Sequence, residues 1–339
     1  MKRIILIASL LLSISALLAQ DAERFRVVWY NVENYFDAQD DSLKLDEEYL
    51  PGGMRGWSVT KYRKKQANIA KVITAVSGWE NAAVIGLCEV ENRYCMVGLA
   101  EYSPLKSLGY EIVHHESPDF RGIDVGMLYD PLQFKPLYDE AIPVNLETGK
   151  PTRDILYVKG LAHRTDTVHF FVCHFSSRWG GTLESEPRRV FTAAIVRSRV
   201  DSILAVNDKA NIVIMGDFND APSDKSMSET LAARPLTAMP DASKLYNMMI
   251  HFEENNIGSH KYQQEWSCLD QIVVSENLLD KASNIRTSQE DTHIFSPDFL
   301  LEKDVKFLGE KPFRTYIGFK YHEGYSDHLP LYLDLWIKK

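Results

Sequence analysis

The sequence contains few cysteines and no excess of positive charge. Only four cysteines occur among 339 residues, and none are spaced as CxxC. A chain of this length can build its own hydrophobic core, so we expect the cysteines to be buried and unpaired. The 38 basic residues are outnumbered by 47 acidic ones, which gives a formal net charge of −9. This balance excludes a protein that coats nucleic acid by bulk positive charge, although it allows a local basic cleft or a bound metal ion.

Repeats and low-complexity segments are also absent. The 18 glycines and 14 prolines are scattered, and no internal repeat or Pro-, Gly- or Ser-rich linker divides the chain. The remaining composition, 45% hydrophobic and 11% aromatic, is typical of an ordinary globular protein. We therefore predict one domain over residues 20–339, which is monomeric and has no stable protein partner.

The one long hydrophobic run lies at the N-terminus. Lys2 and Arg3 precede a mostly apolar segment over residues 4–19, which is shorter than the ~20 residues of a comfortable membrane span. This pattern predicts a signal peptide over residues 1–19 and export to the periplasm or beyond, with an anchor helix as the alternative. Cleavage would remove Lys2 and Arg3, change the net charge from −9 to −11 and leave no transmembrane segment.

Short apolar segments typical of strands outnumber amphipathic helices. We predict strands over residues 25–30, 82–88, 110–114, 124–129, 155–161, 167–173, 212–215, 269–274 and 329–337. Helices are predicted over residues 61–77, 92–108 (broken near Pro104) and 187–206, and a long structured loop over 283–325. Because the helices interrupt the strands rather than alternate with them, the pattern favours two packed sheets with helices outside.

Polar side chains stand at one end of six of these strands. They are Asn31, Glu89, His174, Asp217 with Asn219, Asp270, and Asp327 with His328. Taken singly, each has an alternative explanation as a turn cap or a hydrogen-bonded core histidine. Buried polar groups are costly unless they are paired or bind metal, so their joint occurrence indicates a shared site. If the ends converge, the mixture of carboxylate, amide and imidazole suits Mg²⁺ or Mn²⁺ better than Zn²⁺.

Seven motifs resemble, in family order, those of the endonuclease/exonuclease/phosphatase superfamily, the group similar to DNase I. They are WYNVENYFD (29–37), LCEVEN (87–92), RGIDVGMLY (121–129), HFSSRWGG (174–181), GDFNDAP (216–222), LDQIVVS (269–275) and SDHLP (326–330). The resemblance implies an α+β fold, a four-layer α/β/β/α sandwich with its site at one rim.

The same resemblance implies roles for the site residues. The metal ligands would be Glu89, as the principal one, with Asn31 and Asp327. The catalytic residues would be His174, Asp217, Asn219, Asp270 and His328. Among these, Asp217 would position or deprotonate the attacking water, Asn219 would hold a phosphate oxygen, and Asp270 would orient the ring of His328.

Three arginines are candidates for contacts to the substrate phosphate. The resemblance assigns that role to Arg121 and assigns a supporting role to Asp124. Arg178 lies in the glycine-containing SSRWGG loop, where a loop salt bridge is the alternative, and Arg153 follows a Pro-Thr turn at a strand start.

The reaction class implied is divalent-metal-dependent hydrolysis of phosphoric esters, with Mg²⁺ or Mn²⁺ as cofactor. We favour a secreted or periplasmic nuclease that cleaves phosphodiester bonds by in-line attack of an activated water. The alternative is a phosphatase or a phospholipid phosphodiesterase of inositol-phosphate or sphingomyelin type. A non-catalytic binding module is disfavoured, because none of the principal catalytic residues is missing. The lack of a long basic stripe interleaved with aromatics weighs against binding of long duplexes.

Overall fold

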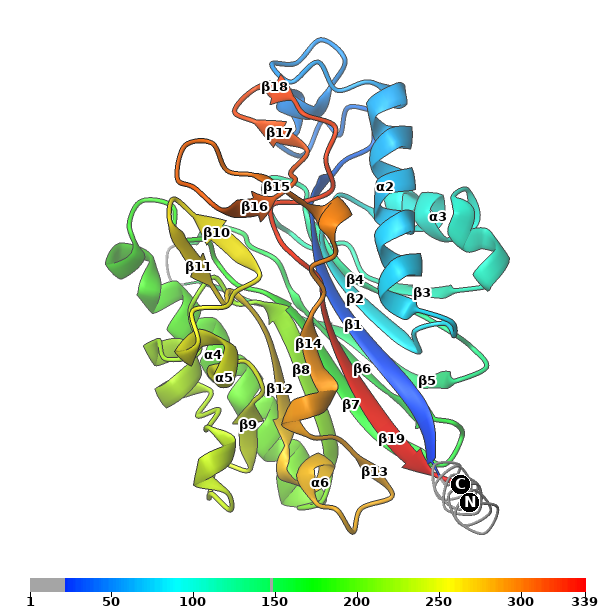
Figure 1. Cartoon of the computed structure of the whole chain (residues 1–339), viewed down its shortest axis with the longest axis vertical. Coiled ribbons are helices and arrows are strands. Elements are labelled where there is room, and N and C mark those ends of the chain that lie inside the picture. Colours follow the sequence, from blue (N-terminus) through cyan, green and yellow to red (C-terminus); the bar gives the residue numbers. More distant parts are fainter. Residues whose placement is uncertain (1–21, 147–148) are drawn as a thin grey trace, which may run out of the picture.

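The computed structural model describes residues 22–146 and 149–339, shown in Figure 1. The predicted signal peptide, residues 1–19, lies outside the described residues, and export stays a prediction. Within the described ranges, no helix is both long enough and apolar enough to cross a membrane.

Two sheets form the centre of the molecule. The first has the order β13 (Ile285–Arg286), β19 (Leu331–Lys338), β1 (Ala22–Tyr35), β2 (Val84–Val90), β4 (Asp124–Tyr129) and β3 (Glu111–His114), with β14 (Thr292–Ile294) also paired to β19. The second has the order β5 (Phe134–Ile142), β6 (Ile155–Ala162), β7 (Asp166–His174), β8 (Asn211–Asp217), β12 (Asp270–Ser275) and β9 (Leu245–Asn247). Each sheet is built around one parallel pair, β1 with β2 and β7 with β8, flanked by antiparallel strands.

Helices cover the outer face of each sheet. The helices α2 (Val59–Ser77) and α3 (Arg93–Glu101) pack on the first sheet, and α4 (Thr182–Val206) packs on the second. Both α2 and α3 begin at a polar side chain, Ser58 and Asn92, which accepts a hydrogen bond from a backbone N–H of the first turn. The layers are therefore helix, sheet, sheet and helix, which confirms the predicted four-layer α/β/β/α sandwich.

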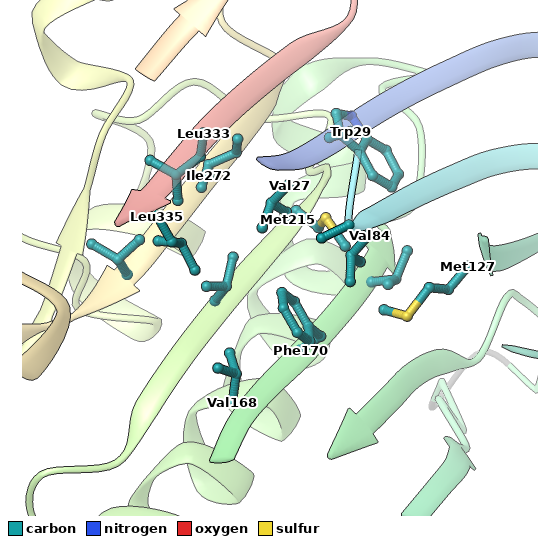
Figure 2. Close-up of a cluster of buried hydrophobic side chains, with 14 of the residues drawn as sticks. Val27, Trp29, Val84, Met127, Val168, Phe170, Met215, Ile272, Leu333 and Leu335 are labelled. Atoms are coloured by element: carbon teal, nitrogen blue, oxygen red, sulfur yellow. The ribbon is translucent and has the colours of Figure 1, made fainter. Parts of the chain in front are cut away.

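Alternation along β1 explains how one strand serves two hydrophobic layers. Val27 and Trp29 point into the core between the sheets, whereas Val28 and Tyr30 pack under α2. Figure 2 shows the core between the sheets, where Val27 and Val84 of the first sheet lie near Phe170 and Met215 of the second. This core connects the two sheets, so it also sets how their strand ends are placed relative to one another.

Replacing Phe170 with Ala should destabilise the sandwich by ~3–5 kcal/mol, the usual cost of truncating a buried aromatic side chain. Phe170 is fully buried, and its ring centroid lies 5.3 Å from that of Phe134 and 6.4 Å from that of Phe25. The free energy of unfolding from urea titration measures the effect, with Trp79→Ala on the exposed surface as the control. A loss no larger than that of the control would contradict this account of the core.

The helix α4 and the edge strand β5 (Phe134–Ile142) differ from the sequence-based expectation. The helix α4 begins at Thr182 and contains Pro187 rather than starting there, so the predicted start was wrong. Arg189 Nη2 donates to the carbonyl of Thr182, and this bond stabilises the extra turn before the proline. Strand β5 was not predicted because it is a sheet edge, where charged residues and Pro136 are tolerated and the apolar pattern is weak.

The stretch 283–325 is irregular but ordered, as expected. It contains two small hairpins, β15 (Leu301–Lys303) with β16 (Glu310–Pro312) and β17 (Tyr316–Ile317) with β18 (Lys320–Tyr321). A third hairpin, β10 (His260–Tyr262) with β11 (Glu265–Ser267), precedes β12. In Figure 1 all three hairpins gather at the same end of the sandwich. The four cysteines are buried and unpaired.

Candidate active site

The strand directions bring the predicted polar residues to one rim of the sandwich. The parallel strands β1, β2, β7 and β8 all end there, while the antiparallel strands β12 and β19 begin there. The register places Asp270 directly opposite Asp217, and His174 opposite Asp217 on its other side. This is the end at which the three hairpins gather in Figure 1.

Asn31 connects the two sheets across the rim. Its Nδ2 donates a hydrogen bond of 3.0 Å to Asp217 Oδ2 and lies 3.5 Å from Glu89 Oε1. Its Oδ1 accepts the backbone N–H of Glu33 at 2.9 Å, which fixes the orientation of the amide. A single buried amide therefore holds the predicted principal metal ligand and the predicted base next to each other.

Glu89 has the surroundings expected of a metal ligand. It lies at a break in strand register between Cys88 and Val90 and has φ of 60°, a left-handed conformation that is costly for a residue with a side chain. Its Oε2 accepts the N–H of Asn34 at 2.9 Å. Among the described residues, no basic side chain forms an ion pair with Glu89. A partly buried carboxylate whose hydrogen-bond partners are the amides of Asn31 and Asn34 fits a hard divalent cation.

The other two predicted metal ligands contribute differently. Asn31 lies beside Glu89, as described above. Asp327 reaches the same rim, where Arg314 Nη2 holds its Oδ2 at 2.8 Å. Arg314 and the neighbouring His328 and His260 lower the pKa of Asp327 to about 2, in spite of its burial. Asp327 is therefore a stable carboxylate, and its oxygen chemistry also suits Mg²⁺ or Mn²⁺.

His328 is held by a buried carboxylate, as predicted. Its Nδ1 lies 2.6 Å from Asp270 Oδ2, and Asp270 also accepts hydrogen bonds from Trp29 Nε1 (2.7 Å) and Ser259 Oγ (2.5 Å). Although burial opposes the charged ring, Asp270 raises the pKa of His328 well above its ordinary value. This shift favours the protonated imidazolium, whose Nε2 faces Asp217 at 3.9 Å.

Asp217 stands between the two histidines. Its Oδ2 lies 3.8 Å from His174 Nε2, and its Oδ1 accepts the N–H of Asn219 at 2.9 Å. Burial raises the pKa of Asp217 to about 7, with His328 opposing the shift. A carboxylate whose pKa lies near neutral pH is basic enough to accept a proton from a water molecule, and a substantial fraction of it is ionised before the reaction.

His174 differs from His328 in its protonation state. Burial and the charges of Arg153 and Arg121 lower the pKa of His174 well below its ordinary value, so the ring is neutral. Its Nδ1 is buried and has no hydrogen-bond partner within the part of the chain described here. Asn219 lies close by, because its Nδ2 donates to the carbonyl of Phe175 at 3.2 Å.

The three predicted phosphate-binding arginines have different surroundings. Arg121 Nη2 donates to Asn34 Oδ1 at 2.7 Å, which places it at the rim beside Glu89. Arg153 is buried, and it donates to Asp119 and to the carbonyl of Phe175. Arg178 Nε donates to the carbonyl of Asn219, and its Nη2 forms a 2.8 Å ion pair with a neighbouring loop aspartate, Asp224. The contacts of Arg153 and Arg178 are thus within the protein, and their role toward phosphate stays a prediction.

Asp124 is not joined to the catalytic group. It is buried, accepts hydrogen bonds from the backbone N–H and side chain of Ser117, and lies 3.1 Å from His114 Nε2. Its contacts therefore stabilise the turn that carries Arg121, so Asp124 would support the site indirectly, through the position of Arg121.

Several residues of the rim were not found from the sequence. One is Glu33, which accepts hydrogen bonds from Arg314 and from the N–H of Thr315. Ser259 and Trp29 both donate hydrogen bonds to Asp270. The fourth is His260, whose ring centroid lies 4.8 Å from that of His328. Glu33 carried a usable signal, because it is two residues after Asn31 on the same strand. Ser259 and His260 carried none, since only the β10–β11 hairpin brings them here.

Comparisons with known proteins agree with this architecture. A family model described as "Endonuclease/Exonuclease/phosphatase family" matches residues 26–337. No curated protein matches the chain. A solved structure of an endonuclease/exonuclease/phosphatase family protein from Bacteroides thetaiotaomicron is 14% identical, with a TM-score of 0.58 over 94% of this chain and 99% of that one.

Two eukaryotic structures are similar to the same extent. Humanized D. rerio TDP2 is 12% identical, with a TM-score of 0.57 over 92% of this chain and 98% of that one. The human Nocturnin catalytic domain is 15% identical, with a TM-score of 0.52 over 93% of this chain and 97% of that one. At such low identity the likeness establishes the fold alone.

Proposed function

Because the chain belongs to the endonuclease/exonuclease/phosphatase family and is a metal-dependent hydrolase of phosphoric esters, we propose that it is an exported nuclease cleaving phosphodiester bonds. One structurally similar protein, D. rerio TDP2, has been solved in complex with a single-strand DNA product, which supports nucleic acid as the substrate class. The N-terminal pattern of a basic pair followed by an apolar run supports export.

The observation that carries the proposal is the placement of Asp217 between Glu89, which it meets through Asn31, and His328. Asp217, with a pKa near 7, accepts a proton from a water aligned with the phosphorus. The His328 imidazolium, oriented by Asp270, donates a hydrogen bond to a phosphate oxygen as negative charge develops there. Asn219 supplies a neutral donor to another phosphate oxygen.

The metal site fits the same reaction. Glu89, with Asn31 and Asp327, would hold the divalent cation, which we propose to be Mg²⁺ or Mn²⁺. When bound, it supplies the positive charge that a phosphodiester needs as it becomes more negative in the transition state. The net charge of −9 is compatible with an anionic substrate because the bound cation would supply positive charge at the rim, next to Arg121.

A substrate panel tests the proposal. Purified protein with Mg²⁺ or Mn²⁺ is incubated with plasmid DNA, RNA, sphingomyelin, phosphoinositides and sugar phosphates. We expect DNA or RNA to be cleaved at least about tenfold more efficiently than the other esters, and EDTA to stop all cleavage. Preferred turnover of a lipid or a phosphomonoester would overturn the nuclease proposal and favour the alternative with that substrate.

A further inference from the structure

A polar cavity of about 260 Å³ adjoins the metal side of the rim. It is lined by Glu33 and Asn34 from the end of β1, by Arg55 from the loop before α2, and by Arg314, Thr315 and Tyr316 from the C-terminal region. We call this space the Arg55 cavity. None of its residues contacts the scissile phosphate in the proposed hydrolysis, although Asn34 donates its backbone N–H to Glu89 and Arg314 pairs with Asp327.

Arg55 is held rigidly at one side of the Arg55 cavity. Its guanidinium carbon lies 5.1 Å from the ring centroid of Tyr49 and 5.2 Å from that of Tyr316. Its Nε donates to Glu48 at 3.0 Å, and its Nη1 donates to the carbonyl of Gly318 at 3.0 Å. Within the described residues, its Nη2 donates to no partner. A fixed guanidinium with a free N–H pair is a pre-organised donor for an anion.

Arg314 supplies a second guanidinium to the Arg55 cavity. Its Nε and Nη2 donate to Glu33 at 3.0 and 2.8 Å, and its Nη2 also pairs with Asp327. Its Nη1 makes no hydrogen bond within the part of the chain that the structure describes, and the side chain is 40% exposed. The carboxylate of Glu33 is occupied on both oxygens, since Thr315 N–H donates to Oε2. Among the described residues, Arg55 Nη2 and Arg314 Nη1 are therefore left to donate hydrogen bonds to a ligand in the cavity.

The Arg55 cavity is connected to Asp217 by a chain of contacts that passes through Glu89. The contacts run in order from Asp217 to the Asn31 amide, from that amide to Glu89, and from Glu89 to the N–H of Asn34, which lines the cavity. In an in-line displacement the attacking water and the leaving oxygen are on opposite sides of the phosphorus. A scissile phosphate bound at Glu89 with Asp217 on its water side would therefore direct its leaving group toward the Arg55 cavity.

We propose that the Arg55 cavity binds a second phosphate group of the substrate, one that belongs to the leaving group. This inference rests on the proposed function and narrows it, because the preferred substrate then carries a further phosphate next to the scissile one. A cavity of this size accommodates about one phosphorylated sugar unit rather than a duplex. In nucleic acid the group is the adjacent backbone phosphate.

Single-linkage methylphosphonates test the inference. A short oligonucleotide is made with one neutral methylphosphonate on either side of a defined cleavable linkage, and kcat/KM is compared with that of the all-phosphate oligonucleotide. We expect the neutral linkage on the leaving-group side to lower kcat/KM about tenfold, the scale of one lost charged hydrogen bond. The neutral linkage on the other side should have a smaller effect.

Variants assign the effect to the Arg55 cavity. Arg55→Gln should reduce the discrimination between phosphate and methylphosphonate to about twofold or less, while Arg55→Lys should retain part of it. Arg63→Gln, on the exposed surface of α2, is the control and should retain the wild-type ratio. Because the readout is a ratio within one protein, a partly unfolded variant does not imitate the result. A wild-type ratio near one, or an unchanged ratio in Arg55→Gln, overturns the inference.

Separate experiments test the nuclease activity and the binding of phosphate in the Arg55 cavity. If no oligonucleotide is cleaved, the nuclease proposal fails first, and a free phosphorylated small molecule becomes the source to test. Binding of a nucleoside 3′,5′-bisphosphate and of an inositol polyphosphate to the Asp217→Asn variant, by calorimetry, distinguishes these sources. Weaker binding after adding Arg55→Gln supports the cavity with either ligand, and unchanged binding of both contradicts it.

Discussion

Replacing Asp217 with Asn should lower kcat at least about 100-fold, because the amide cannot accept the proton of the attacking water. The substitution keeps the size of the side chain and the acceptor for the N–H of Asn219. Initial rates on a cleavable oligonucleotide, together with thermal unfolding of both proteins, measure the effect.

The pH dependence of turnover in the wild type and in Asp217→Asn is a second test of the role of Asp217. The carboxylate must be ionised to act, so wild-type turnover should be present above pH ~7 and decline as the pH falls through the raised pKa of Asp217, about 7. This acidic decline should be absent from the residual rate of Asp217→Asn. The control is Asp201→Asn on the exposed side of α4, which should match the wild type. Near-wild-type turnover in Asp217→Asn would refute the role of the base.

Replacing His328 with Ala should also lower kcat about 100-fold or more, because it removes a charged donor aimed at the scissile phosphate. The truncation also leaves Asp270 buried without its imidazolium, so some loss of stability accompanies it. The matched control is His293→Ala, an exposed histidine on β14 that stacks on Tyr332. Turnover by His328→Ala within tenfold of the wild type would contradict the assignment.

Asp270→Asn tests whether the positive charge of the His328 ring is needed, because the amide can still hold the ring in place but does not raise its pKa. Asp270 raises the pKa of His328, so the imidazolium persists as the pH rises above the ordinary histidine value, and activity should decline only at alkaline pH. In Asp270→Asn the pKa of His328 should fall, and the alkaline decline should move to lower pH. An NMR titration of the ring tests this directly. An upward shift also stabilises the folded state at low pH, and that contribution is lost as the pH rises through the raised pKa.

Much of the rim could be predicted because its residues terminate strands. Asn31, Glu89, Asp217, Asp270 and His328 each interrupt or flank an apolar run, and the directions of β1, β2, β7 and β8 then force their convergence. The same logic does not cover residues whose position depends on hairpin packing. Hairpin register is a tertiary property, and an isolated histidine in a polar segment carries no periodic signal.

Buried cations were the hardest feature to predict. Lys65 belongs to a basic run at the start of α2 that is typical of a solvated helix surface. In the structure it is buried, and its Nζ donates to Thr315 Oγ1 and the carbonyl of Tyr325. Arg189 is likewise buried in α4 and pairs with Asp220 of the GDFND loop at 2.6 Å. Burial of such groups is set by partners far away in sequence, which local composition does not reveal.

Glu89, joined through Asn31 to Asp217, should hold a divalent cation at the rim. Titration of metal-free protein with Mn²⁺, followed by electron paramagnetic resonance of the free ion, measures this binding. Wild type and the surface control Glu101→Gln should bind Mn²⁺ alike, and Glu89→Gln should bind it at least about tenfold more weakly. Equal Mn²⁺ affinity in Glu89→Gln and wild type would contradict the account.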